Sequence, residues 1–308
     1  MIGKLFIKDD RLRPPWRVII YAITVVFVAA VLYDIYDYVT REPYTPQITF
    51  SEMIAGEVIT AVAVLFVSFF FRHYIDRRSV VSLGFALRGP WLRLLGLGIL
   101  FGAGMQTVAN ATLWLSGSSH VTGHASLTND LNLIAVAGVV LLAGALLEEL
   151  SFRGYVLQNL WEEWGLVPAI VISSLAFAAL HLSNPHWREQ LVLTLAGLLA
   201  FGLWACMSLV WTKSLWLALG AHLAWNLFEG PVYGLPLSGV VMPVPTVFTQ
   251  SVSGPQWLTG GSFGPEAGLS SLIGLAIGFV VLRALFIKGA FANVFDASEY
   301  YARTQRLS

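Results

Sequence analysis

The sequence is poor in charged residues and nearly devoid of cysteine. Only 12% of its 308 residues are charged, about half of what a soluble globular domain usually carries. Its 18 Lys and Arg balance its 18 Asp and Glu, so no basic field exists to attract phosphates, and a nucleic-acid partner is excluded. The single cysteine, Cys206, excludes an intrachain disulfide and any cysteine-rich zinc or iron–sulfur site.

Apolar residues are what the chain has in excess. They make up 56% of it, and the mean hydropathy is +0.71. Such a chain could not cover its own apolar surface in water, so it is predicted to be an integral, multi-pass membrane protein, in the cell membrane if the source is bacterial. A membrane helix needs about 20 mostly apolar residues. Eight segments approach this, which predicts an all-α fold with about eight transmembrane helices at residues 18–33, 53–71, 94–115, 131–160, 166–182, 190–211, 214–229 and 269–287.

The distribution of Lys and Arg predicts the orientation, because cytoplasmic loops carry most of these residues. With the N-terminus in the cytoplasm, only Arg41 and Arg188 fall outside, and Arg153 lies within the fourth span. Both termini are therefore expected to be cytoplasmic. The fifteen residues on the cytoplasmic side are Lys4, Lys8, Arg11, Arg13, Arg17, Arg72, Arg77, Arg78, Arg88, Arg93, Lys213, Arg283, Lys288, Arg303 and Arg306.

The fourth span contains three charged residues that packing does not require. Glu148, Glu149 and Arg153 each cost a few kcal/mol or more at membrane depth. Glu149 and Arg153 are four residues apart on one helical face, where they can neutralise each other. Glu148 lies about 100° round the helix and needs another partner.

The fifth and seventh spans supply candidate partners at similar depth. Phe177 and His181 are four apart on one face, as are His222 and Asn226. At about 1.5 Å per residue, Glu148, His181 and Asn226 lie roughly 18–22 Å from the inner ends of their helices. A lone membrane histidine usually makes an interhelical hydrogen bond, and the Glu149–Arg153 pair alone could be a structural staple. Burying all of these polar and charged side chains in the membrane costs too much free energy for helix packing to be their only role.

Other polar residues have simpler interpretations. Glu57 is expected to be an interfacial acid near the outer end of its span, and His120 and His124 are expected to be solvated loop residues. Residues 230–268 are rich in Gly, Pro and Ser with Glu266 as their only charge, and a solvated outer loop is favoured over a lid.

Three motifs resemble those of a known family, the CAAX protease and bacteriocin-processing family. They are Glu148-Glu149-Leu-Ser-Phe-Arg153-Gly154, Phe177-x-x-x-His181 and His222-x-x-x-Asn226. The resemblance to its type II CAAX prenyl endopeptidases covers about a third of the chain. It implies an intramembrane endopeptidase with a cavity among helices four to seven. It also divides the chain into an N-terminal three-helix region (1–130), a catalytic core (131–230) and a region with the long outer loop, the last helix and a polar tail (231–308).

The resemblance leaves two mechanisms open. In the metal-free version, which we favour, Glu148 is the general base, His181 polarises the water, and His222 and Asn226 stabilise the oxyanion. Glu149, Arg153 and Phe177 would support them, and no cofactor is needed. In the zinc version, Glu148, His181 and His222 would bind the metal.

The expected substrate is a membrane-embedded or lipidated peptide or protein, which would reach the cavity from the bilayer or from the cytoplasmic side. A prenylated C-terminal peptide would suit an apolar cavity. Two rival interpretations of the buried polar set are an ion- or proton-coupled transporter and a non-catalytic scaffold. No oligomeric state follows from the sequence.

Overall fold

The computed structural model describes residues 6–8, 11–40, 50–87, 89–125 and 127–291. Within them, seven helices are long and apolar enough to cross a membrane, which confirms the all-α, multi-pass fold. Lys4, Arg41, Arg88, Arg303 and Arg306, which the orientation prediction used, lie outside the described residues.

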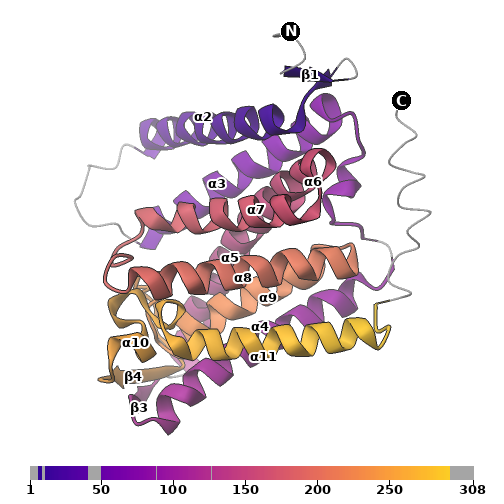
Figure 1. Cartoon of the computed structure of the whole chain (residues 1–308). Coiled ribbons are helices and arrows are strands. Elements are labelled where there is room, and N and C mark those ends of the chain that lie inside the picture. The colour runs from indigo at the N-terminus through magenta and orange to yellow at the C-terminus, as the bar shows by residue number, and fades with distance from the viewer. Residues whose placement is uncertain (1–5, 9–10, 41–49, 88, 126, 292–308) are drawn as a thin grey trace.

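Most helices run roughly along one direction through the bundle (Figure 1). The first three spans are α2 (Pro14–Thr40), α3 (Phe50–Phe70) and α4 (Trp91–Leu115). The fourth consists of α5 (Leu127–Glu148), the π-helix η3 (Glu149–Leu157) and α6 (Gln158–Trp164). The remaining long helices are α7 (Leu166–Leu180), α8 (Leu191–Thr212) and α11 (Leu269–Ile287).

The predicted seventh span is shorter than a membrane crossing. It is α9 (Trp216–Leu227), continued by the π-helix η5 (Phe228–Val232). Glycines let its backbone touch that of α4: a Cβ added at Gly102 would lie 2.1 Å from the carbonyl oxygen of Ala221, and one at Gly220 would lie 2.3 Å from that of Leu95. Such close approach is how small residues join membrane helices. α9 is therefore an inner helix of the bundle. Its length is determined by the helices it packs against rather than by the thickness of the bilayer.

The segment 231–268 differs from the solvated loop that its composition predicts. Strand β4 (Phe248–Val252) pairs antiparallel with β3 (Ser119–His124), and short turns follow at α10 (Gln256–Thr259), η6 (Gly261–Phe263) and η7 (Pro265–Ala267). Leu235, Leu258 and Phe263 are buried. The segment is a folded cap over one end of the bundle. His120 and His124, on β3, are exposed as expected.

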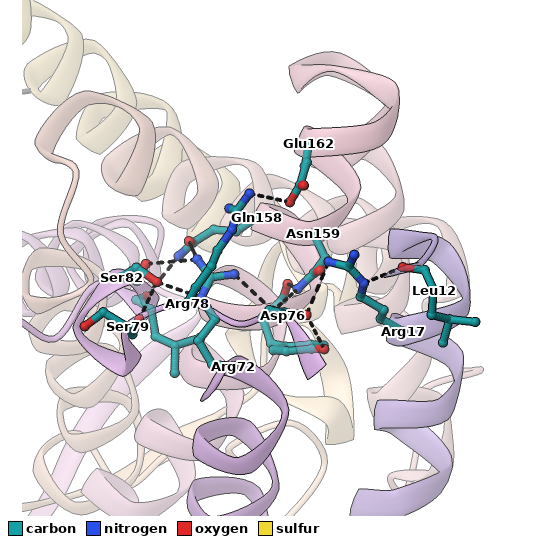
Figure 2. A network of polar contacts seen from close by, with 12 residues as sticks. Leu12, Arg17, Arg72, Asp76, Arg78, Ser79, Ser82, Gln158, Asn159 and Glu162 are labelled. Carbon is teal, nitrogen blue, oxygen red and sulfur yellow. Dashed lines mark hydrogen bonds and ion pairs between the residues drawn. The ribbon is translucent and has the colours of Figure 1, made fainter. Parts of the chain in front are cut away.

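At the other end, a polar network ties the N-terminal helix to the core (Figure 2). The carboxylate of Asp76 lies 3.5 Å from Arg17 of α2 and 3.2 Å from Arg72, which belongs to the π-helix η1 (Phe71–Ile75). Asn159 of α6 donates to the same carboxylate at 3.2 Å. Nearby, a small hairpin of β1 (Ile7–Lys8) and β2 (Arg11–Leu12) precedes α2. The 3₁₀ turn η2 (Val80–Leu83) and the turn η4 (His181–Ser183) complete the described elements.

Candidate active site

The four predicted catalytic residues line one cavity of about 690 Å³. Glu148 is the last residue of α5, and His181 begins the turn that follows α7. His222 and Asn226 lie one turn apart on α9. The structure thus brings residues of α5, α9 and the turn after α7 to one cavity, as their depths in the sequence predict.

Glu148 and Glu149 stand where the fourth span changes from α-helix to π-helix. π-segments are rare, and they occur frequently at functional sites because one extra residue per turn re-aims the side chains. The two adjacent carboxyls have different surroundings. Glu148 lines the cavity, while Glu149 is fully buried beside it.

One carboxylate oxygen of Glu149 accepts hydrogen bonds from two neighbouring side chains. Its Oε1 accepts a hydrogen bond from Nη1 of Arg153 at 3.0 Å and another from Nδ1 of His222 at 2.9 Å. The pairing with Arg153 is the one predicted from their spacing. The contact with His222 was not predicted, and it means that Glu149 orients this histidine. Because Nδ1 is the donor to Glu149, the other ring nitrogen, Nε2, is left to face Glu148, 3.6 Å from its Oε2.

His181 is oriented by the backbone. Its Nδ1 donates to the carbonyl oxygen of Phe177 at 2.9 Å, so Nε2 carries no proton in the neutral ring and is free to accept one. His181 is 9% exposed and lines the cavity.

Phe177 separates the cavity from Arg153. The guanidinium carbon of Arg153 lies 4.4 Å from the centre of the Phe177 ring, a cation–π contact, and neither Arg153 nor Glu149 is solvent-exposed. The ring therefore covers the buried ion pair and presents an apolar face to the site.

The cavity is also lined by residues that were not predicted from the sequence. Glu57, expected to be an interfacial acid near the end of its span, also lines the cavity from α3. Glu266 lines it from η7, where its carboxylate accepts hydrogen bonds from Nε1 of Trp225 at 3.0 Å and from Ser238. The cavity is therefore not confined to helices four to seven. The only signal for Glu266 was its position as the sole charge of its segment.

The donors of the zinc version do not form a metal site as they stand. Glu148 and His222 are close enough to share an ion, and imidazole with carboxylate is suitable chemistry for zinc. Within the described residues, however, no three His, Cys, Asp or Glu side chains are grouped so that they could hold a metal.

Comparison with known families identifies the segment that carries the site. Residues 130–228 match the family model described as type II CAAX prenyl endopeptidase Rce1-like. This confirms the resemblance noted in the three motifs, and it supports an intramembrane endopeptidase in general. The search of curated proteins and the search of solved structures each gave no match.

Proposed function

We propose that the protein is an intramembrane endopeptidase in which Glu148 activates a water molecule to hydrolyse a peptide bond of a membrane-associated substrate. The observation that carries the proposal is the convergence of Glu148, His181, His222 and Asn226 on one cavity within the segment that matches the protease family. Peptide hydrolysis needs a base for the water and donors for the oxyanion, and this set offers both.

The first step is proton removal from the attacking water. Glu148 lines the cavity, and its Oε2 has no hydrogen-bond partner among the described residues. In the proposed step it takes the proton from a water that also donates to Nε2 of His181. As that proton moves to Glu148, the water oxygen attacks the substrate carbonyl.

The second step is stabilisation of the resulting oxyanion. The side-chain amide of Asn226 can donate to it directly. His222 can donate through Nε2 when the ring carries both protons, and the Glu149 carboxylate at Nδ1 stabilises that charged ring. Glu148 then returns its proton to the leaving amine, which completes hydrolysis. In this scheme Glu149 and Arg153 act through His222 and are positioning residues.

The test is cleavage by the purified chain, reconstituted in liposomes, of a library of lipidated peptides that includes prenylated C-terminal sequences. Glu148→Gln should lower turnover by about 10²–10⁴ because it removes the base. Glu162→Gln is the matched control, since Glu162 pairs with Arg78 at the far end of the fourth span. Near-normal cleavage by Glu148→Gln would exclude this mechanism.

Two further measurements separate the roles. Asn226→Ala should cost about 10²–10³ in turnover, the usual loss for one oxyanion donor, with little change in the thermal midpoint. Cleavage is also measured after treatment with a chelator. If cleavage persists in the chelator, the zinc version is excluded. If the chelator abolishes cleavage and added zinc restores it, the zinc version replaces the metal-free mechanism.

A further inference from the structure

A cluster of fully buried polar side chains lies outside the set that the mechanism uses. Each member has one polar atom without a hydrogen-bond partner among the described residues. These atoms are Oε1 of Gln106 and Nδ2 of Asn110 on α4, Oε1 of Glu229 on η5, and the hydroxyls of Ser270 and Ser271 on α11. Buried polar groups in native proteins nearly always have a partner, so these five atoms require one.

Contacts between the three elements bring these side chains together. Nε2 of Gln106 donates a hydrogen bond to the Glu229 carboxylate, which joins α4 to η5. α11 crosses α4 at the neighbouring residue, because a Cβ added at Gly274 would lie 2.4 Å from the carbonyl oxygen of Met105. The two serines lie one turn before Gly274 on α11, so they share the helical face that meets α4. The unpartnered atoms therefore belong to one junction of α4, η5 and α11.

The unpartnered atoms are complementary in their chemistry. Asn110 and Gln106 are four residues apart on one face of α4, and the first leaves a donor unused while the second leaves an acceptor unused. One water molecule can accept from such a donor and donate to such an acceptor, and the serine hydroxyls can do either. A buried water makes about three hydrogen bonds, so about two waters would satisfy the five atoms.

The cluster adjoins the catalytic cavity. Oε1 of Glu229 faces the segment before η7, since a Cβ added at Gly264 would lie 3.3 Å from it. Two residues later, Glu266 lines the cavity, and it is close enough to Glu229 for the two carboxyl groups to interact. Leu275, one turn after Ser271 on α11, also lines the cavity. The inner end of the cluster therefore meets the cavity at Glu266 and α11.

At its other end the cluster reaches the cap. Nε2 of Gln250 on β4 donates to Oδ1 of Asn110 at 3.0 Å. Oε1 of Gln250 accepts a hydrogen bond from Nε1 of Trp114 at 2.6 Å, and Trp114 is 36% exposed, so this end lies at the molecular surface. A line of polar side chains thus runs from the surface beside the cap to the cavity. We call it the polar track, and it consists of Gln250, Asn110, Gln106, Glu229 and Glu266.

We infer that the polar track holds ordered water and delivers it to the catalytic cavity from the cap side, by a route separate from that of the substrate. The inference rests on the proposed function, because each hydrolysis consumes one water molecule. A peptide bound in a cavity of about 690 Å³ buries most of its own surface there and leaves little room for solvent to pass it. In a hydrolase surrounded by lipid, a second route replaces the water while substrate is bound.

The first test asks whether the cluster is hydrated, and it needs no cleavage. In a dry site, Ser270→Ala and Ser271→Ala would each remove a buried hydroxyl without a partner, which raises the thermal midpoint. With water bound, each substitution removes a hydrogen bond instead, and the midpoint should fall by about 2 °C. Ser173→Ala is the matched control, because its buried hydroxyl donates to the carbonyl oxygen of Phe152 at 2.8 Å. We expect the midpoints of all three variants to fall. If neither α11 variant loses stability, the inference is wrong.

The second test asks whether the track supplies the reaction. Gln106→Leu is close in size and replaces the amide with an apolar group. With a lipidated peptide as substrate, we expect kcat to fall by about tenfold, the equivalent of one buried hydrogen bond. KM should be unchanged, because Gln106 is not part of the cavity lining. Gln190→Leu, the same substitution at a residue that bonds Gln256 outside the cavity lining, should leave kcat unaltered.

Gln106→Ser separates water supply from a structural role. Serine is smaller than glutamine, so this variant loses packing and stability but leaves space for additional water. We expect it to keep a kcat near that of the parent although its thermal midpoint falls, whereas Gln106→Leu loses turnover. If kcat follows the thermal midpoint across the two variants, Gln106 acts through stability and delivery by the track is wrong.

The outcomes distinguish this inference from the proposed function. If the chain cleaves no peptide, the proposed function fails and water delivery falls with it, but the midpoints of the serine variants still decide whether the cluster binds water. If Glu148→Gln abolishes cleavage while Gln106→Leu cleaves at the rate of the parent, the proposed function stands and delivery by the track is wrong.

Discussion

At the scale of single residues, the stability of the site depends on Arg153. It neutralises Glu149 at 3.0 Å where neither side chain touches solvent. Removing one partner of a buried pair leaves an uncompensated charge, which costs about 3–5 kcal/mol. Arg153→Ala should therefore lower the thermal midpoint in detergent and abolish cleavage together. Arg153→Lys, which keeps the charge, should recover part of both. An unchanged midpoint in Arg153→Ala would show that Glu149 does not need this partner.

At the scale of elements, the contact between α4 and α9 positions half of the site, because His222 and Asn226 lie on α9. A Cβ at Gly102 would lie 2.1 Å from a backbone oxygen of α9, whereas one at Gly104 would meet nothing within 4 Å. Gly102→Ala should push the helices apart and lower both turnover and the thermal midpoint. Gly104→Ala, on the same helix, should leave both unchanged, since alanine favours a helix. Equal effects of the two substitutions would argue against close packing here.

At the scale of the whole molecule, Asp76 fastens the N-terminal helix to the core (Figure 2). Its carboxylate forms ion pairs with two buried arginines, Arg17 of α2 and Arg72 of η1. Asp76→Ala would leave both buried arginines without this carboxylate partner. We therefore expect about 3–5 kcal/mol of destabilisation and faster hydrogen exchange in α2. Arg78→Ala, which breaks the part-exposed pair with Glu162, should cost at most about 1 kcal/mol. If exchange in α2 is unaltered in Asp76→Ala, another contact holds this helix.

Much of the molecule could be predicted locally. Apolar composition determined the membrane class, and spacing along one helix determined the Glu149–Arg153 pair, because residues four apart share a helical face. The depths of Glu148, His181 and Asn226 followed from the rise per residue and predicted that they would share one region. The roles of these residues and the three-region division of the chain remain predictions.

Tertiary structure decided the rest. The sequence could not show that Glu149 binds His222, that Glu57 and Glu266 line the cavity, or that the Gly- and Pro-rich segment folds into a cap. Nor could it show the π-helix at Glu149, because an apolar period of 3.6 residues does not report a local change of winding. Sequence by itself determined which segments form membrane-spanning helices, since hydropathy acts along each span. Which of them meet depends on how distant helices pack, and that is set by contacts between residues far apart in the chain.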